Sequence, residues 1–257
     1  MSVPFYVPPE QATKEKAEFA RKGIARGRPL IVLEYAGGIL FVAENPSTHL
    51  HKVAELYDRI AFAAVGRFSE FENLRQAGVR LADIRGYAYG REDVTSRSIA
   101  NAYSQTLGQI FVQEFKPYEV ELCVAEVGID GAPNAMYHIV FDGNVFDRKG
   151  FLAMGGQSDE LNTELQRAYD EDMELEAALQ LAMRVLPRVA PAGETGNSRL
   201  EVAVLESGRP RRSFRRLTQE DVEPRAGGVR RPGFRYHRKV VLRRRLGARA
   251  MPNGPVC

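Results

Sequence analysis

The sequence predicts an α+β fold of four layers, in which two antiparallel sheets lie between two layers of helices (αββα). Short apolar segments typical of strands occur in three groups along the chain, and a pair of helical segments separates each group from the next. Two pairs of helices cannot cover one face of a single small sheet. Stacking two sheets and covering each outer face with a pair of helices buries every apolar face.

An N-terminal helix is predicted over about 9–26, before the first strands. Pro9 suits the first helical position. Its apolar face, formed by Ala17, Ala20 and Ile24, is thin, so we expect the helix to pack against another part of an assembly. The strands that follow are predicted at 30–33, 39–43, 53–57 and 60–65.

The middle and last parts of the chain complete the alternation. Thr95 is predicted to cap the second of two long helices, and Asp142-Gly143 forms the turn of a hairpin. Ser158 is a candidate cap for a later helix. The helices are predicted at 67–84, 95–115, 158–169 and 175–186, and the strands at 118–127, 136–141, 144–146, 151–154, 200–205 and 213–217.

Charge is distributed unevenly along the chain. The net charge of +3 combines +12 between residues 209 and 249, from 15 basic and 3 acidic residues, with −9 elsewhere. We therefore expect an acidic folded domain over 9–217, preceded by a short segment at 1–8. The basic tail at 218–257 shows no apolar periodicity, and we expect it to be disordered.

The cysteines and the apolar segments bear on the compartment. Cys123 and Cys257 do not form a disulfide framework, which is typical of a reducing compartment. The N-terminus lacks the features of a signal peptide, and the apolar runs are too short to span a membrane. We expect a cytoplasmic protein.

Motifs for catalysis or cofactor binding are missing from the sequence. There is no nucleophile elbow, phosphate-binding glycine loop or dinucleotide fingerprint. None of the histidines (His49, His51, His138 and His237) has metal-ligand spacing. We expect no catalytic residue, metal or cofactor, a structural role for His138, and solvated positions for the carboxylates Glu70, Glu72, Asp170, Glu171 and Asp172.

Several segments, in order, resemble the α subunit of the actinobacterial 20S proteasome, in the superfamily of N-terminal-nucleophile hydrolases. The resemblance covers about residues 1–217 and implies the αββα fold that the strand and helix order predicts. The segments are 21–26, 38–47, 55–60, 85–89, 116–126, 200–205 and 209–211.

The resemblance implies a non-catalytic subunit. Catalytic β subunits begin with a threonine whose free amine acts as base, whereas the first strand here follows a helix, and Thr13 lies within that helix. The implied partners are further copies in a seven-membered ring, the β subunits, and a ring-shaped ATPase or other activator. The implied substrates are proteins tagged by a ubiquitin-like protein.

The resemblance also implies three functional regions. The N-terminal segment would gate the pore, Lys52 would receive activator C-termini between neighbouring subunits, and a segment after the second long helix would form the pore annulus. The gate residues are Val3, Pro4, Phe5, Tyr6, Val7 and Pro8, and the annulus residues are Lys116, Pro117 and Tyr118.

Two departures from the family leave alternatives open. Pro8 stands where a serine would cap the N-terminal helix, and the basic tail replaces a segment that is often acidic. The tail could bind nucleic acid, but a solvated tail without a partner, or a shifted reading frame, is favoured. The other alternative is a catalytic hydrolase of the same fold.

Overall fold

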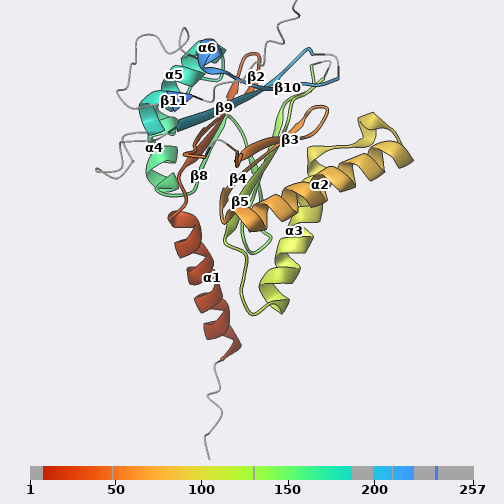
Figure 1. Cartoon of the computed structure of the whole chain (residues 1–257), viewed down its shortest axis with the longest axis vertical. Helices are drawn as coiled ribbons and strands as arrows, with labels where there is room; N and C mark the ends of the chain where they lie inside the picture. The colour runs from red at the N-terminus through yellow and green to blue at the C-terminus, as the bar shows by residue number, and fades with distance from the viewer. Residues whose placement is uncertain are drawn as a thin grey trace, which may run out of the picture.

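The computed structural model describes residues 8–47, 49–129, 131–186, 199–209, 211–222 and 235–236. It confirms the four-layer α+β sandwich: α2 and α3 lie on one side of the two sheets, and α4 and α5 lie on the other (Figure 1). Among the helices that the structure describes, none combines the length and the apolar character that a bilayer-spanning segment needs.

Sheet A is antiparallel in the order β10-β9-β2-β1-β8, and a short segment, β11, joins β9 in parallel. In the middle of this sheet β2 pairs with β1 on one side and with β9 on the other. The strands are β1 (Leu30–Tyr35), β2 (Gly38–Glu44), β8 (Phe151–Met154), β9 (Arg199–Glu206), β10 (Phe214–Arg216) and β11 (Arg235–Tyr236).

Sheet B is antiparallel in the order β3-β4-β5-β6-β7. Its last hairpin turns at Asp142-Gly143 as predicted, where Asp142 Oδ1 accepts a 3.0 Å hydrogen bond from the Asn144 N–H and Gly143 has a φ of 89°. The strands are β3 (Val53–Tyr57), β4 (Ile60–Gly66), β5 (Val120–Glu126), β6 (Ala135–Ile139) and β7 (Val145–Arg148).

The five predicted helices are all present near their predicted positions, and the described chain adds a short helix, α6, and a 3-10 turn that were not predicted. Thr95 caps α3 as predicted, since its hydroxyl accepts a 3.3 Å bond from the Ser98 N–H. Ser158 is instead the first residue of α4, and the cap position belongs to Gln157. The helices are α1 (Pro9–Ala25), α2 (Phe68–Ala88), α3 (Ser96–Gln113), α4 (Ser158–Ala168), α5 (Leu175–Val185) and α6 (Gln219–Val222), with a 3-10 turn, η1 (Arg91–Asp93).

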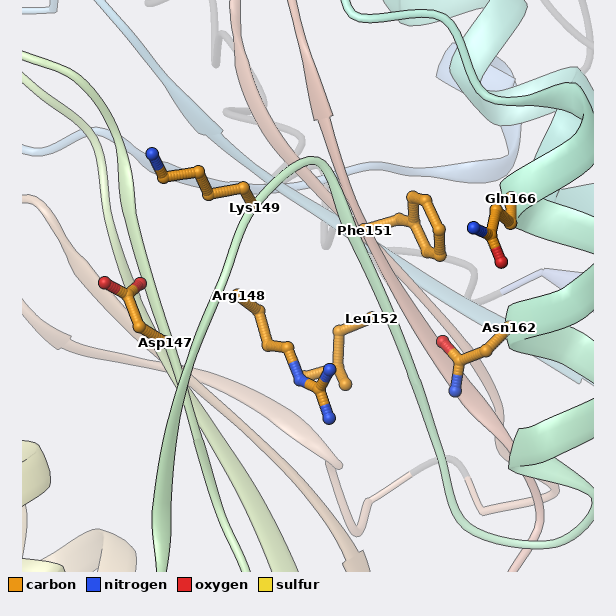
Figure 2. Close-up of a pocket in the computed structure, with 7 residues that line it drawn as sticks. All are labelled: Asp147, Arg148, Lys149, Phe151, Leu152, Asn162 and Gln166. Carbon is orange, nitrogen blue, oxygen red and sulfur yellow. The ribbon is translucent and has the colours of Figure 1, made fainter.

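A single side chain covers part of the outer edge of β8 in sheet A. The Asn162 Oδ1 of α4 accepts a 2.9 Å hydrogen bond from the Ala153 N–H, and its Nδ2 donates a 3.1 Å bond to the Ala153 carbonyl. The turn from β7 to β8 opens beside this contact into a groove of about 540 Å³ (Figure 2). It is lined by Asp147, Arg148, Lys149, Phe151, Leu152, Asn162 and Gln166.

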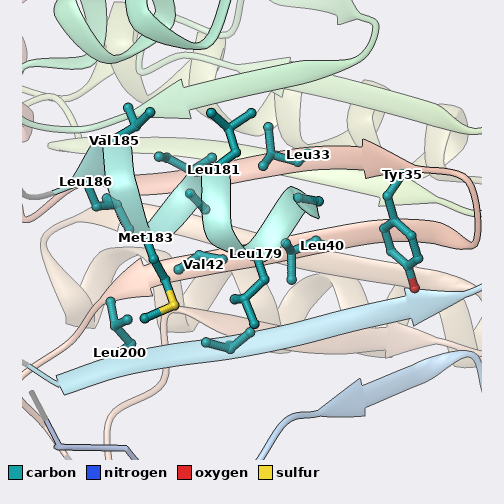
Figure 3. Packing of buried hydrophobic residues seen from close by; sticks show 14 of the residues in the cluster. Leu33, Tyr35, Leu40, Val42, Leu179, Leu181, Met183, Val185, Leu186 and Leu200 are labelled. Atoms are coloured by element: carbon teal, nitrogen blue, oxygen red, sulfur yellow. The ribbon is translucent and has the colours of Figure 1, made fainter. Parts of the chain in front are cut away.

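Three apolar clusters fill the spaces between the four layers. One lies between α4–α5 and sheet A, where Leu179 and Met183 of α5 face Leu40 and Val42 of β2 (Figure 3). A second lies between the sheets and includes Phe41, and a third lies between sheet B and α2–α3. Each sheet face therefore has an apolar partner, which is the physical reason for the four-layer arrangement.

The packed chain continues beyond the predicted boundary at residue 217. Thr218 donates from its N–H and from its hydroxyl to Asp221 Oδ2, both at 2.8 Å, and this contact forms α6. Val222 is fully buried in the cluster under α4 and α5. The predicted disordered tail, 218–257, thus includes the helix α6 and the short strand β11, and its remaining residues, 223–234 and 237–257, lie outside the described residues.

Candidate functional site

Lys52 lies directly before β3, in the segment that connects β2 to β3. Its side chain is partly buried, and its Nζ donates a 2.6 Å hydrogen bond to the carbonyl oxygen of Arg28. Arg28 belongs to the short linker between the end of α1 and the start of β1. The lysine that the resemblance assigns to activator docking therefore contacts the joint between α1 and the sandwich.

A buried carboxylate, that of Glu201 in β9, fixes the backbone around Lys52. The Glu201 side chain is 0% exposed, and its oxygens accept hydrogen bonds from the N–H groups of Lys52 at 2.9 Å and Val53 at 3.3 Å. These bonds join the start of β3 in sheet B to β9 in sheet A. The position of Lys52 is thus set by a contact between the two sheets.

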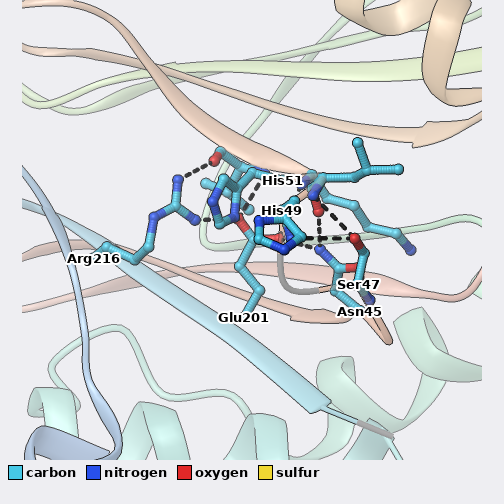
Figure 4. Close-up of polar contacts among 9 residues, drawn as sticks. Asn45, Ser47, His49, His51, Glu201 and Arg216 are labelled. Atoms are coloured by element: carbon cyan, nitrogen blue, oxygen red, sulfur yellow. Dashed lines mark hydrogen bonds and ion pairs between the residues drawn. The ribbon is translucent and has the colours of Figure 1, made fainter. Parts of the chain in front are cut away.

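Three side chains complete the surroundings of Glu201 (Figure 4). Asn45 Nδ2 lies 2.7 Å from one carboxylate oxygen, His51 Nδ1 lies 3.3 Å from the other, and the Arg216 guanidinium pairs with that second oxygen. Arg216 also donates a 2.8 Å bond to the Val53 carbonyl. We call Asn45, His51, Lys52, Glu201 and Arg216 the Glu201 cluster.

The turn at Asn45-Pro46-Ser47, directly after β2, contributes Asn45 to the cluster. Asn45 Oδ1 accepts a 3.0 Å hydrogen bond from the Ser47 N–H, and Ser47 Oγ accepts one of 3.0 Å from the Leu50 N–H. Such side-chain contacts replace backbone pairing in turns. The Asn45 amide also donates to the Leu50 carbonyl at 2.6 Å, which fixes the chain just before Lys52.

The Glu201 carboxylate is ionised at neutral pH in this cluster. Burial opposes ionisation, but the hydrogen bond from His51, the charge of Arg216 and the Lys52 N–H lower the pKa of Glu201 to about 2.

Lys52 has an unusually low pKa for a lysine. Burial lowers the pKa of its ammonium to about 8, and Arg28 acts in the same direction, whereas the charges of Glu201 and Glu44 oppose the shift. An ammonium removed from water gains more than an exposed one from a carboxylate that reaches it. Lys52 is therefore a candidate for binding the carboxylate of another molecule.

The predicted annulus lysine, Lys116, lies in a different environment. Its Nζ lies 2.6 Å from Glu70 Oε1 and 3.0 Å from Glu119 Oε1, and 5.7 Å from the centre of the Phe19 ring of α1. Arg67 Nη2 lies 3.3 Å from the same Glu119 oxygen. Burial alone would lower the pKa of Lys116, but the hydrogen bonds to the two carboxylates raise it above its usual value.

The other two predicted annulus residues lie between α3 and β5. Pro117 is buried, and Tyr118 is partly buried against the apolar cluster beneath α2 and α3. The structure thus brings Lys116, Pro117 and Tyr118 together in one segment, which the contacts of Lys116 attach to α1 and α2.

Glu70 corrects one expectation from the sequence. It was expected to be solvated, but it is only 8% exposed, and its Oε2 accepts a 2.6 Å hydrogen bond from the Glu119 N–H. The same carboxylate contacts Lys116 through its other oxygen. Its position in the first turn of α2 directs it toward the segment that precedes β5, which the local sequence does not reveal.

Of the predicted gate residues, the structure describes only Pro8; Val3, Pro4, Phe5, Tyr6 and Val7 lie outside the described residues. Pro8 occupies the cap position of α1, and no side-chain hydrogen bond from it caps the helix, as its lack of a side-chain oxygen predicts. Its carbonyl accepts the N–H groups of Gln11 and Ala12 at 2.9 and 3.1 Å.

The contacts of α1 with the sandwich are few, in agreement with its thin apolar face. Only Ala20 and Ile24 are buried along the helix. Lys16 Nζ donates to the carbonyl oxygens of Phe111 at 3.2 Å and Glu114 at 2.7 Å, at the C-terminal end of α3. Beyond this contact α1 extends away from the body of the molecule (Figure 1).

Within the part of the chain that the structure describes, no group of histidine, cysteine or acidic residues could hold a metal ion. His138 lies in β6, where its Nε2 is 2.5 Å from Glu121 Oε1. The Thr13 hydroxyl donates to the Pro9 carbonyl at 2.8 Å, as expected for a threonine on a helix. Strand β1 opens at Leu30, after α1.

Comparison with known proteins gives the family. A family model described as "Proteasome subunit" matches residues 24–205. The chain belongs to the proteasome subunit family. The matched region begins near the end of α1 and ends in β9, so it includes all of sheet B, strands β1, β2, β8 and most of β9 in sheet A, and the Glu201 cluster except Arg216.

Curated relatives give the type of subunit. Proteins named proteasome subunit alpha are 55% identical over 219 residues in Saccharopolyspora erythraea (85% of this chain, 86% of the relative) and 58% identical over 221 residues in Acidothermus cellulolyticus (84% and 94%). The Mycolicibacterium smegmatis protein of that name is 53% identical over 228 residues (87% and 93%). The resemblance to an actinobacterial α subunit is thereby confirmed, and with it a structural, non-catalytic role.

The sequence indicates Lys52 through its family resemblance, but not the residues that hold it. Glu201 is a charged residue inside an otherwise apolar predicted strand, at 200–205, and this is the signal that could have found it. Arg216 was predicted to lie in the last strand, at 213–217, and was counted in the basic stretch from 209 to 249 without a role of its own. In the structure it belongs to the core of the cluster.

Proposed function

We propose that this chain forms the seven-membered α ring that caps the β rings of a cytoplasmic 20S proteasome and controls the passage of protein substrates. Residues 1–8 would close the pore. Lys52 would receive the C-terminal carboxylate of a ring-shaped ATPase or other activator, which would deliver proteins tagged by a ubiquitin-like protein. Lys116, Pro117 and Tyr118 would form the narrow annulus beneath the gate.

The environment of Lys52 is the observation that carries this proposal. The cluster fixes the Lys52 backbone, and the Lys52 ammonium contacts a neutral carbonyl, that of Arg28, at 2.6 Å. A lysine ammonium has three donors, so this contact leaves capacity for a carboxylate. Such a group is suited to a chain terminus, which brings a carboxylate at its end.

The position of α1 supports a role in gating. Its C-terminal end leads into the linker that Lys52 contacts, and its N-terminal end leads to the predicted gate segment. A helix of 17 residues spans about 25 Å. One rigid element therefore connects the predicted docking residue with the predicted gate.

Deletion of residues 2–8 tests the gate. Because the deletion removes the apolar segment that would occlude the pore, we expect faster hydrolysis of a fluorogenic peptide by the barrel reconstituted with its β partner. Titration of the β active sites with a covalent inhibitor controls for the amount of competent enzyme. Unchanged hydrolysis per active site would contradict gating by this segment.

Lys52→Ala tests the docking site. Loss of a hydrogen bond to a charged group costs about 1.5–3 kcal/mol, so we expect activator binding to weaken about tenfold or more. The matched control is Lys149→Ala, which removes an exposed lysine from the turn between β7 and β8. Equal activator affinity in the wild type and Lys52→Ala, with the barrel intact by electron microscopy, would refute the assignment.

A further inference from the structure

We propose that Glu201 is the positioning residue of the Lys52 site: it holds the backbone N–H of Lys52 in place and contributes negative charge near its ammonium. The inference rests on the proposed docking function of Lys52, which it deepens. Glu201 acts through Lys52, so it would not itself contact the docked carboxylate.

The geometry gives Glu201 this role. Lys52 lies at the end of the segment from 45 to 52, which forms no sheet pairing of its own within the described residues. The segment is joined to β9 by the Lys52 N–H at 2.9 Å and the Asn45 amide at 2.7 Å, and both bonds end on Glu201. Removal of that carboxylate would free the Asn45 amide and the Lys52 N–H, and the Lys52 backbone would keep its carbonyl bond to the Ala64 N–H of β4, at 3.0 Å.

The charges around Lys52 support the second part of the role. The groups that face it are Glu201 from β9, Glu44 from β2 and Arg28 from the linker after α1. Glu44 pairs with Arg28 at 2.6 Å, so its charge is balanced beside the site. Glu201 is the larger of the two influences that favour the charged form of Lys52.

The remaining charges act on Glu201 from its other side. Arg216 of β10 pairs with one carboxylate oxygen, and His51 lies 3.3 Å from the same oxygen. A neutral side chain at position 201 would remove a negative charge near Lys52 and leave the positive charge of Arg216 unbalanced. Both changes favour the neutral form of Lys52. Replacement of Arg216 by a neutral residue should act in the opposite direction.

The experiment measures the titration of Lys52 directly in the assembled particle. Competitive labelling with acetic anhydride, read by mass spectrometry at each lysine from pH 6 to 11, gives the pH midpoint of Lys52 reactivity without any activator. We expect Glu201→Gln to lower this midpoint by about one pH unit or more. Arg216→Gln should raise it, and this second variant tests the proposal even if Glu201→Gln fails to assemble.

Glu206→Gln is the matched control, because Glu206 lies on the same strand and pairs with Arg215 at 2.6 Å, far along β9 from the cluster. We expect no change of the Lys52 midpoint in this variant. A midpoint that is the same in wild type, Glu201→Gln and Arg216→Gln would overturn the proposal.

Activator binding at several pH values then separates charge from general loss of structure. Arginine stays protonated at all these pH values, so in the Lys52→Arg background the Glu201→Gln substitution should no longer shift the pH dependence of docking. The same shift in both backgrounds would overturn the charge role. If Lys52→Ala leaves docking intact while Glu201→Gln moves the Lys52 midpoint, the docking function fails and the positioning contact stands.

Discussion

Lys52 and Lys116 lie in two regions of the molecule, and these two partly buried lysines have opposite electrostatic surroundings. Lys116 contacts two carboxylates, at 2.6 and 3.0 Å, and its pKa is raised. Lys52 contacts a neutral carbonyl, and its pKa is lowered to about 8. The carboxylates near Lys52 are each paired with an arginine, Glu201 with Arg216 and Glu44 with Arg28.

The difference separates a structural lysine from one suited to binding. An ammonium between two carboxylates gains little from a third, so Lys116 serves to attach the segment before β5 to α2. An ammonium that burial has destabilised gains more when a carboxylate arrives. This contrast supports the proposal of Lys52, rather than Lys116, as the docking residue.

The largest expected effect is on stability, and it differs between removal of Glu201, beside Lys52, and removal of Glu70, beside Lys116. Glu201→Ala leaves the Arg216 cation and two backbone N–H groups without their acceptor, so we expect the free energy of unfolding to fall by about 3–5 kcal/mol. Glu70→Ala releases one N–H and the more exposed Lys116, at a cost of about 1–3 kcal/mol. Chemical denaturation of the two variants checks the order, and equal losses would remove the distinction between the regions.

We next expect the contributions of Lys52 and Lys116 to the free energy of unfolding to depend on pH in opposite directions. Unfolded Lys52 keeps its proton up to about its usual pKa of 10.5, whereas folded Lys52 loses it near 8. The unfolded state thus binds more protons between these values, and the contribution of Lys52 to stability rises with pH through that window, by roughly 3 kcal/mol. Lys116 has a raised pKa, so its contribution is full below the unfolded value and is lost as pH rises through the folded one.

The measurement is the free energy of unfolding from pH 7 to 11, taken as the difference between wild type and Lys52→Met and, separately, between wild type and Lys116→Met. Slopes of the same sign for the two lysines would contradict the comparison.

The smallest expected effect is the change in stability at neutral pH when either lysine is replaced by methionine. Lys52→Met removes one hydrogen bond but also a buried charge, so stability at pH 7 should stay the same or rise by up to about 1 kcal/mol. Lys116→Met should lower it by about 1 kcal/mol, because Glu70 and Glu119 lose their shared cation. Thermal denaturation at pH 7 checks both; a clear loss of stability in Lys52→Met would show that the lysine is structural after all.

Most of the fold could be predicted from the sequence because local signals and burial agree. The hairpin at Asp142-Gly143 and the cap at Thr95 are in place. The predicted ends of α2 and of the domain were wrong, because tertiary contacts determine where they lie. α2 continues to Ala88, past the predicted end near residue 84, and Val222 completes an apolar cluster beyond the predicted end of the domain.

The candidate site was less predictable, for a physical reason. Lys52 and Glu201 are 149 residues apart, and their contact exists only because the two sheets stack. No periodicity within β3 or β9 encodes that meeting. The burial of Glu70 was not predicted for the same reason, since its partner Glu119 is 49 residues away. The gate residues from Val3 to Val7 remain a prediction.

The Asn162 side chain has a consequence for a chain that works in many copies. By forming both backbone hydrogen bonds with Ala153, it imitates one rung of a neighbouring strand at the border of sheet A. A foreign strand would have to displace that amide before it could extend the sheet. Other copies of the chain are thereby hindered from pairing with this edge strand and aggregating.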